Sequence, residues 1–272
     1  MFVLLITDPG NAIILQKSCP VEVTMNLTQF WQTNPKAAIA FSGGVDSAYL
    51  LYSAVQSGAE VKAYYAKTAF QPAFELEDAK KLANQLGARM EILSLDVLSV
   101  PNVAENPKNR CYYCKTALFS AISAAAKKDG FSLLLDGTNA SDEVSDRPGM
   151  QALRELCVRS PLRECGLTKP EIRRLSKEAG LFTHDKPAYA CLATRIPTGD
   201  VITPEKLART EEAEGYLHTL GLRDFRVRTL GDTARIQVTE SDLQTVLKNR
   251  AAIFSHLKKL YSGVVLDLEV RP

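Results

Sequence analysis

Long hydrophobic runs and a strong charge of one sign are both missing from this sequence. The longest uninterrupted apolar runs, 1–6 and 188–193, have six residues, whereas a membrane-spanning helix needs about 20. The 33 basic and 31 acidic residues leave a formal charge of +2, too little to bind nucleic acid or an anionic membrane through overall charge. We therefore expect a soluble protein without a membrane partner, and we disfavour nucleic acid as a partner.

Targeting and disulfide signals are also weak. The first residues lack a basic segment, and Pro9 and Gly10 cut the apolar stretch short, so we expect no signal peptide. Without an export signal, the six cysteines are expected to be thiols or metal ligands rather than a disulfide framework. This cysteine usage favours a cytoplasmic location.

The composition is that of a folded protein with a sizeable core. Apolar residues make up 46% and charged residues 24% of the 272 positions, and this length predicts two domains at about 100–200 residues each. Residues 1–35 are expected to be a leader of unknown role, with a short hairpin of 2–6 with 12–15 as its only structure. Met25 precedes a possible helix start and is an alternative first residue.

From Lys36 onward, short apolar strands alternate with helices. Strands are predicted over 37–41, 61–66, 89–95 and 132–136, and helices over 47–56, 75–86, 111–127 and 169–179. Such βαβ units form an open parallel sheet that is covered on both faces and binds ligands at the carboxyl ends of its strands. We therefore predict an α/β domain over 36–185.

A smaller α+β domain is predicted over 186–272, after a segment without clear periodicity. A helix begins at Thr203-Pro204, two strands are expected at 224–230 and 234–238, and a helical stretch at 241–260 precedes a last strand at 264–270. We expect this domain to serve the substrate or the association of subunits into a homo-oligomer.

The sequence Ser42-Gly43-Gly44-Val45-Asp46-Ser47 lies between the first strand and the first helix. Glycines let the backbone approach an anion, and the unpaired first amides of the helix attract it. Phosphate groups of a nucleotide are the natural ligand, and Asp46 is suited to a magnesium ion that bridges them. The alternative is a simple tight turn. No Gly-Lys-Ser/Thr follows, so this is not a Walker loop.

A second polar loop is predicted at the same edge of the sheet, after the fourth strand. Gly137, Asn139, Asp142 and Arg147 are its candidate ligand-binding residues. The alternative is a connection whose Asn and Asp side chains only cap its own backbone.

Three cysteines are candidate metal ligands. Cys111 and Cys114 are three residues apart at the start of a helix, so both thiols lie on one face, and Cys191 lies between the predicted domains. The pair alone is compatible with a redox dithiol, half of a zinc site or cluster ligands. No second CxxC occurs, which weakens a zinc site, and His184 near the domain boundary is a possible further zinc ligand. Three thiolates can hold a [4Fe-4S] cluster and leave one iron open for sulfide.

Several motifs over residues 37–200 together resemble the LarE family of PP-loop, ATP-dependent sulfur transferases. They are SGGVDS, CYYC, DGTNxSDxxxDRPG, SPLxxxGLTKxEIR and ACLATRIPxG, in this order. The resemblance implies an adenine nucleotide alpha hydrolase-like fold with ATP and Mg²⁺ as cofactors. It also implies the adenylylation of a carboxylate of pyridinium-3,5-biscarboxylic acid mononucleotide, in which sulfur then replaces AMP during nickel-pincer nucleotide biosynthesis.

The resemblance implies two possible sources of sulfur. One branch of the family sacrifices a single cysteine, and here Ala190 and Cys191 both lie at the position where that cysteine would align. Another branch is similar to this chain in having CxxC and a later Cys, and uses an iron–sulfur cluster. We favour the cluster, bound by Cys111, Cys114 and Cys191, with Cys191 at the reaction centre and a sulfide source as a further partner.

Arg226 and Arg228 alternate along a predicted strand, so their side chains lie on one face, with Arg235 on the neighbouring strand. Guanidinium groups bind phosphate well. The resemblance implies that this pair lies near the substrate phosphate and that Glu214 occupies an acidic catalytic position. The alternative is a set of solvated arginines.

Three other functions share some of these features. A tRNA thiolation enzyme shares the loop, but the sequence has no extended basic stripe. A nucleotide-binding redox sensor leaves Asp46 and the arginine pair without a role. An ammonia-dependent synthetase leaves the cysteines without one. We therefore predict an enzyme that acts on a small-molecule nucleotide.

Overall fold

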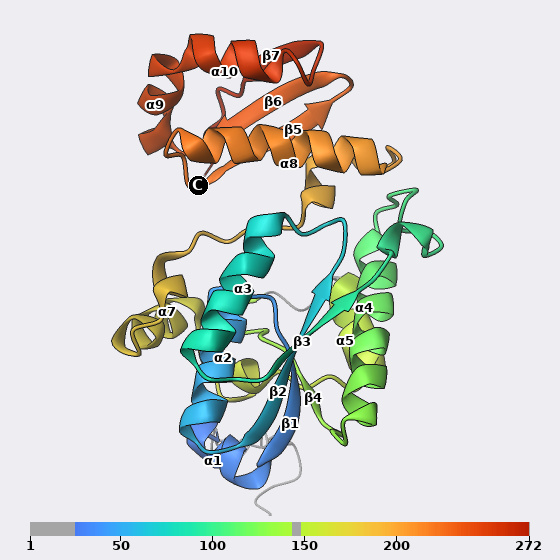
Figure 1. Ribbon diagram of the computed structural model, residues 1–272, viewed down its shortest axis with the longest axis vertical. Helices are drawn as coiled ribbons and strands as arrows, with labels where there is room; N and C mark the ends of the chain where they lie inside the picture. Colours follow the sequence, from blue (N-terminus) through green and yellow to red (C-terminus); the bar gives the residue numbers. More distant parts are fainter. Residues whose placement is uncertain (1–24, 143–147, 272) are drawn as a thin grey trace, which may run out of the picture.

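Two separate sheets organise the chain (Figure 1). The structure, a computed structural model, describes residues 25–142 and 148–271. The first sheet has four parallel strands in the order β3-β2-β1-β4, and the second has three in the order β5-β6-β7. The strands are Lys36–Ala40 (β1), Glu60–Lys67 (β2), Met90–Ser94 (β3), Leu134–Leu135 (β4), Phe225–Leu230 (β5), Thr233–Val238 (β6) and Gly263–Leu266 (β7). The predicted α/β class, with a parallel sheet and a smaller second unit, is confirmed.

Helices connect these strands. The α-helices are Leu27–Thr33 (α1), Val45–Gln56 (α2), Ala73–Gln85 (α3), Arg110–Lys128 (α4), Pro148–Glu155 (α5), Pro161–Glu164 (α6), Lys169–Glu178 (α7), Pro204–Thr219 (α8), Leu243–Lys248 (α9) and Arg250–Leu257 (α10). Short 3₁₀ helices cover Val97–Ser99 (η1), Phe182–Asp185 (η2), Leu192–Arg195 (η3) and Glu240–Asp242 (η4). None of the helices within the described ranges is both long and apolar enough to cross a membrane.

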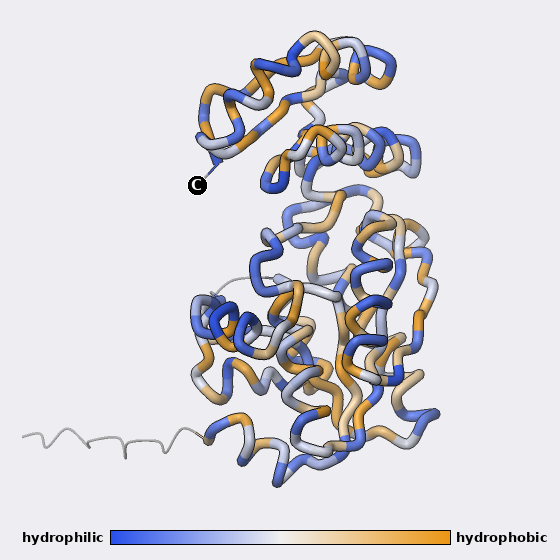
Figure 2. The backbone as a smooth tube through the Cα atoms, turned by 60° about the vertical axis from the view of Figure 1, so that its left-hand side comes forward, coloured by the Kyte–Doolittle hydropathy of each residue, from blue (hydrophilic) through white to orange (hydrophobic). Residues whose placement is uncertain are grey.

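The first sheet is buried on both faces because its strands carry apolar residues at successive positions. Ala37 and Ile39 of β1 pack in the cluster that includes α2 and α3, whereas Ala38 packs with Ile122 and Ala126 of α4. In Figure 2 the helices alternate between hydrophobic and hydrophilic colours, as expected of helices with one buried face. Each fully buried aliphatic side chain contributes about 1.5–3 kcal/mol, so both layers of helices hold the sheet in place.

Three α-helices pack on one face of the second sheet. Leu217 of α8, Val246 of α9 and Ile253 of α10 pack in one cluster with the apolar residues of β5 and β6. The opposite face of this sheet carries Arg226 and Arg228 of β5. This face lies against the segment that connects the two units, because both arginines donate to backbone carbonyls there.

The connecting segment, 186–202, packs against both units. Its Leu192 and Ile196 share a buried cluster with Phe70 and Val103 of the first unit and with Leu207 of α8. The domain bounds 36–185 and 186–272 stay a prediction.

The elements differ from the sequence predictions at several points. The helix predicted over 241–260 is divided, because Asn249 ends α9 and its side chain caps the carbonyl of Thr245 at 2.8 Å. The last strand ends at Leu266, since the carboxylate of Asp267 accepts from the backbone N–H of Glu269 and forms a turn. Helix α7 begins at Lys169, as predicted, and ends at Glu178, one residue earlier than predicted. The hairpin predicted at 2–6 and 12–15 lies outside the described residues.

Candidate active site

The loop Ser42-Gly43-Gly44 joins β1 to α2 at the carboxyl edge of the first sheet. Gly43 has φ +73°, which favours glycine, and a Cβ there would lie 3.1 Å from the Cβ of Ala79. The Ser47 hydroxyl accepts from the N–H of Ser42 and donates to the carbonyl of Gly44, both at 3.2 Å, so it fixes the loop from inside. The first amides of α2 receive no side-chain cap and stay available to an anion.

Nothing in the protein's own structure requires a glycine at position 44. Its φ of −79° and ψ of 163° suit any residue, and a Cβ would meet only the Ser42 hydroxyl, at 3.4 Å. The space beside Gly44 belongs to a cavity that is also lined by Asp46 and Lys169. The missing side chain therefore leaves room for a ligand.

Asp46 lies in the first turn of α2 and faces this cavity. Its Oδ2 accepts from the Lys169 ammonium at 2.5 Å, and its Oδ1 is buried without a hydrogen-bond partner among the described residues. Burial raises the pKa of Asp46, and the positive charge of Lys169 opposes that rise. A buried carboxylate oxygen with no other partner fits the predicted contact with Mg²⁺.

The loop after β4 supports the phosphate loop from the side. A Cβ on Gly137 would lie 2.8 Å from the backbone N of Ser47, so this loop packs directly against the backbone at the start of α2. Asn139 donates its N–H to the Asp142 carboxylate and accepts from the N–H of Ser141. These contacts match the alternative in which Asn139 and Asp142 cap their own loop, and their predicted contact with nucleotide stays a prediction. Arg147 lies outside the described residues.

Two adjoining cavities meet at this edge. The first is mainly apolar, and its lining includes Ala40, Phe41, Tyr65, Phe70, Leu118 and Cys191. The second is polar and includes Gly44, Asp46, Lys169, Arg173 and Lys186. Ser42, Glu75 and Tyr189 line both. An apolar chamber beside a basic one suits a nucleoside with its phosphates.

Three basic residues of the polar cavity escaped the sequence predictions. Lys169 and Arg173 lie four residues apart on α7, so both face the cavity, and this spacing is a signal that sequence reasoning could have used. Lys186 follows η2 and pairs with Glu75 at 2.9 Å and Asp78 at 2.7 Å. Burial raises the pKa of Glu75, and Lys186 opposes that rise. No local pattern places Lys186 there.

Of the three predicted cysteine ligands, only Cys191 belongs to the lining of the apolar cavity. Cys111 and Cys114 lie in the first two turns of α4, and Cys191 directly precedes η3. Burial, and then the charges of Cys191 and Cys111, raise the pKa of Cys114 to about 12. Burial also raises the pKa of Cys191, opposed by the nearby Arg110. Cys114 and Cys191 pack against the same apolar cluster, whereas the joint binding of a metal centre by all three cysteines stays a prediction.

A single-ion zinc site is not formed by the described residues. Within 25–142 and 148–271, no group of three or more His, Cys, Asp or Glu side chains is arranged to hold a metal ion. The His184 ring, a possible zinc ligand by sequence, contacts the carbonyl of Leu181 at 3.0 Å.

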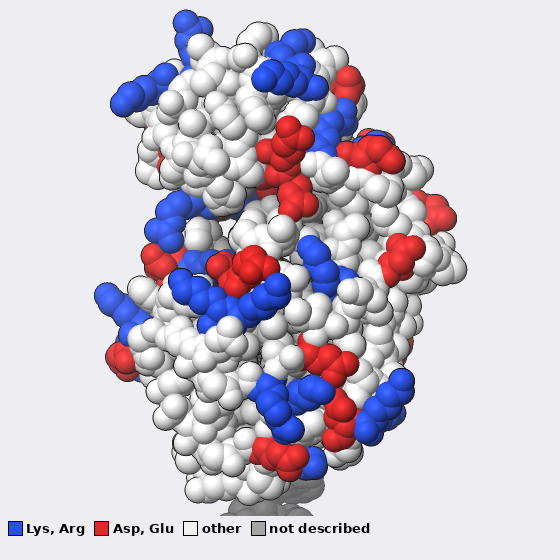
Figure 3. Space-filling model, in the orientation of Figure 1, with Lys and Arg blue, Asp and Glu red and all other residues white. Residues whose placement is uncertain are grey.

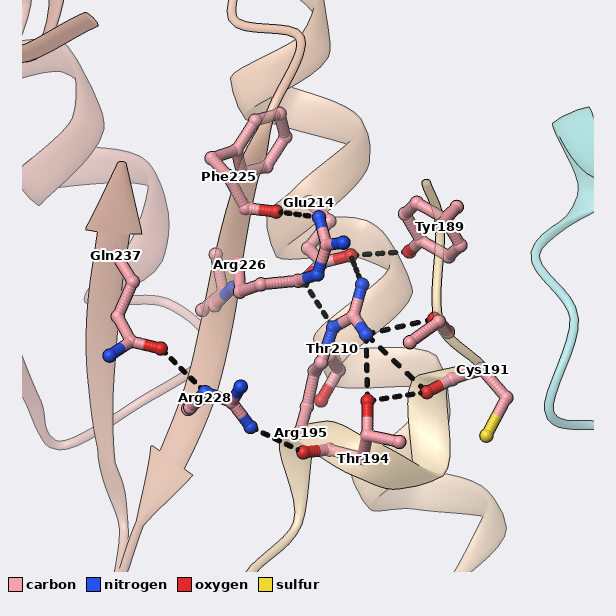
Figure 4. A network of polar contacts seen from close by, with 12 residues as sticks. Tyr189, Cys191, Thr194, Arg195, Thr210, Glu214, Phe225, Arg226, Arg228 and Gln237 are labelled. Atoms are coloured by element: carbon pink, nitrogen blue, oxygen red, sulfur yellow. Dashed lines mark hydrogen bonds and ion pairs between the residues drawn. The ribbon is translucent and has the colours of Figure 1, made fainter. Parts of the chain in front are cut away.

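The arginines of β5 face the connecting segment (Figure 4). Arg226 donates to the carbonyls of Phe225 and Ala188, both at 2.6 Å, and is buried. Burial lowers its pKa to about 10. Arg228 is half-buried and donates to the carbonyl of Thr194 at 2.7 Å. The predicted common face is confirmed, whereas the contact of both residues with a substrate phosphate stays a prediction.

Glu214 lies on α8, 2% exposed, and both of its oxygens accept from protein donors. Arg195 contributes Nε at 2.8 Å and Nη2 at 3.0 Å, the backbone N–H of Val227 donates at 2.9 Å, and the Tyr189 hydroxyl donates as well. Its predicted catalytic role stays a prediction. Arg195 and Tyr189 escaped the sequence predictions, since only the folded chain brings them to Glu214.

The parallel sheet, the SGGVDS loop at the β1–α2 junction and the basic cavity beside it define a PP-loop protein of the nucleotide-binding α/β class. Comparison with known proteins agrees. The model of the family described as queuosine biosynthesis protein QueC matches residues 36–105.

Full-length relatives narrow the family. Pyridinium-3,5-bisthiocarboxylic acid mononucleotide synthase of Lactiplantibacillus plantarum is 34% identical over 236 residues, which cover 86% of each chain. The chain belongs to the family of this synthase, the LarE family. An uncharacterized protein of Synechocystis sp. is 38% identical over 90% of this chain and 92% of its own. The tRNA-specific 2-thiouridylase MnmA of Thermotoga maritima is 26% identical over 82% of this chain and 79% of its own.

Proposed function

We propose that this protein is an ATP-dependent sulfurtransferase that converts the carboxylates of pyridinium-3,5-biscarboxylic acid mononucleotide into thiocarboxylates. The observation that carries the proposal is the position of Cys191, which lines the same cavity as Ser42 of the phosphate loop. A sulfur-bearing group and an ATP-binding loop then share one chamber. Family membership supplies the substrate class, since the related synthase is named for the bisthiocarboxylic acid.

The first step activates the acceptor. A carboxylate oxygen attacks the α-phosphorus of ATP, the bond to the β-phosphate oxygen breaks, and pyrophosphate leaves with its electron pair. Lys169, Arg173 and Lys186 lie where they would stabilise the charge of pyrophosphate. Asp46 would hold Mg²⁺ through its unpartnered oxygen, and the ion would supply charge neutralisation between the phosphates.

The second step replaces AMP by sulfur. A sulfide nucleophile adds to the acyl carbon, the carbon–oxygen bond to AMP breaks, and the carboxylate becomes a thiocarboxylate with no change in carbon oxidation state. The apolar wall formed by Phe41, Phe70 and Leu118 would exclude water, which otherwise hydrolyses the acyl adenylate.

Cys111, Cys114 and Cys191 would hold a [4Fe-4S] cluster, which would supply an iron atom open to sulfide. Cys114 and Cys191 pack against the same apolar cluster, and Cys111 precedes Cys114 by three residues on α4, which supports this set of ligands. In this proposal, Arg226 and Arg228 bind the substrate phosphate. An external sulfide source supplies the sulfur, and the protein forms a homo-oligomer.

The tRNA thiolases among the relatives make tRNA thiolation the second candidate. On the face shown in Figure 3, basic and acidic side chains are interspersed rather than gathered into a basic stripe, which favours a small acceptor.

The proposed function predicts acceptor-dependent pyrophosphate release. With ATP and Mg²⁺, the dicarboxylate mononucleotide should yield one AMP and one pyrophosphate for each carboxylate activated, whereas its dicarboxamide analogue should yield neither. Coupled pyrophosphate detection and AMP quantification measure this. Release that responds to tRNA alone would favour the second candidate, and nucleotide binding without any release would indicate a sensor.

A further inference from the structure

The backbone around Cys191 pairs with no β-strand. Its carbonyl groups instead accept hydrogen bonds from arginine guanidinium groups. Residues 186–191 belong to no helix or strand. Five backbone carbonyls between 188 and 194 accept from four arginines. Arg226 donates to Ala188, Arg195 to Ala190 and Cys191, Arg110 to Ala193, and Arg228 to Thr194. We call these four arginines the arginine clamp.

The clamp draws on both units of the protein. Arg110 begins α4 of the first unit and Arg226 and Arg228 lie on β5 of the second, while Arg195 ends η3 within the segment itself. Figure 4 shows Arg195 at the carbonyl of Cys191 and Arg228 at the carbonyl of Thr194, with Arg226 on the same strand as Arg228. Both units therefore contact the backbone of the segment that carries Cys191.

Glu214 fixes the central arginine of the clamp. It accepts two hydrogen bonds from Arg195. It also accepts from the backbone N–H of Val227 on β5 and from the hydroxyl of Tyr189 in the connecting segment, so the ion pair contacts both. The Arg195 guanidinium also lies 4.7 Å from the centre of the Tyr189 ring. Arg195 and Glu214 are 1% and 2% exposed. A buried ion pair adds little net stability over apolar residues of the same volume, so stability alone gives this pair no clear purpose.

We propose that Arg195 and Glu214 are positioning residues, which hold the backbone of Cys191 so that its sulfur lies at the wall of the nucleotide cavity. Arg195 acts on the carbonyls of Ala190 and Cys191, and Glu214 acts through Arg195. Because sulfur transfer needs the reacting atoms in near-contact geometry, a displacement of about 1 Å costs on the order of 100-fold in rate. This consequence rests on the proposed function, whereas the clamp itself does not.

The test compares two variants with a matched control. Arg195→Lys keeps the charge but loses the two-pronged contact. The double variant Arg195→Met with Glu214→Leu replaces the pair by apolar residues, an exchange that is often neutral or stabilising for folding. Arg209→Lys is the control, because Arg209 lies on the same helix as Glu214 but pairs with Asp232.

Three readouts separate positioning from folding. Thermal unfolding checks that each full-length variant is folded. Peptide mass spectrometry follows the alkylation of Cys191 by iodoacetamide in protein stripped of iron with a chelator, with the exposed Cys157 as internal reference. Acceptor-dependent pyrophosphate release and thiocarboxylate formation are measured on reconstituted protein.

We expect both clamp variants to change the Cys191 alkylation rate by at least about 10-fold and to lower thiocarboxylate formation by about 10–100-fold, a larger loss than that of pyrophosphate release. Arg209→Lys should match the native protein throughout. A folded clamp variant with native alkylation and native sulfur transfer would overturn the proposal, and so would an equal loss of pyrophosphate release and sulfur transfer. If the native protein activates no carboxylate, the proposed function fails while the alkylation rates still decide on the clamp.

Discussion

Cys191→Ala is expected to lower sulfur transfer by at least about 100-fold while pyrophosphate release stays within about twofold. Activation of the carboxylate needs the phosphate loop and the basic residues of the polar cavity, and Cys191 is not part of the lining of that cavity. Sulfur delivery needs Cys191, on the wall of the apolar cavity, whether it binds iron or donates its own sulfur. The two steps should therefore separate in this variant.

Anaerobic purification with iron and acid-labile sulfide analysis extends this prediction. The native protein should hold about four irons per chain, and Cys191→Ala should lose them, as should Cys111→Ala and Cys114→Ala. Cys165→Ala is the matched control, since this half-buried cysteine packs against the core of the first sheet. Unchanged iron in Cys191→Ala, or zinc in place of iron, contradicts the cluster. A native protein that loses a sulfur atom from Cys191 itself during turnover supports the sacrificial route instead.

Gly44→Ala is expected to weaken ATP binding by about 10–100-fold, because an added methyl group in a filled site costs about 1–3 kcal/mol and about 1.4 kcal/mol is tenfold in affinity. The free protein should tolerate the change, since the backbone of Gly44 suits alanine and only the Ser42 hydroxyl lies within 4 Å of the new Cβ. Isothermal titration calorimetry with ATP and Mg²⁺ measures the affinity, and urea unfolding measures the stability.

Gly215→Ala is the control for this experiment. A Cβ at Gly215, within α8, would meet nothing within 4 Å, so the substitution should raise stability by up to about 1 kcal/mol and leave ATP affinity unchanged. Native ATP affinity in folded Gly44→Ala would show that phosphate does not bind beside this glycine.

Much of the first unit could be predicted because local signals and the tertiary structure agree there. The buried strand before Ser42 and the periodic helix after it lead to the observed β1–loop–α2 junction. The division at Asn249 was missed, since the apolar period continues across it and only the Asn249 side chain marks the break. Strand β4 is also shorter than predicted, because the carboxylate of Asp136 turns the chain at Thr138.

The candidate site was predictable only where its residues are close in sequence. Ser42 to Ser47 form one motif, and Cys111 and Cys114 form another. Lys186, Tyr189 and Arg195 join the site through contacts with α3 and α8, which no local pattern contains. The same holds for Arg226 and Arg228 of β5. Strand alternation predicts that they share a face, but it does not predict which backbone carbonyls they contact.

The most direct test of the central claim follows the oxygen atoms of the acceptor. If the carboxylate is adenylylated and sulfur then displaces AMP, an acceptor labelled with ¹⁸O in its carboxylates should pass one labelled oxygen to the phosphate of each AMP released, as measured by mass spectrometry. Unlabelled AMP formed together with thiocarboxylate would show that the carboxylate never joined the α-phosphate, and would contradict the account.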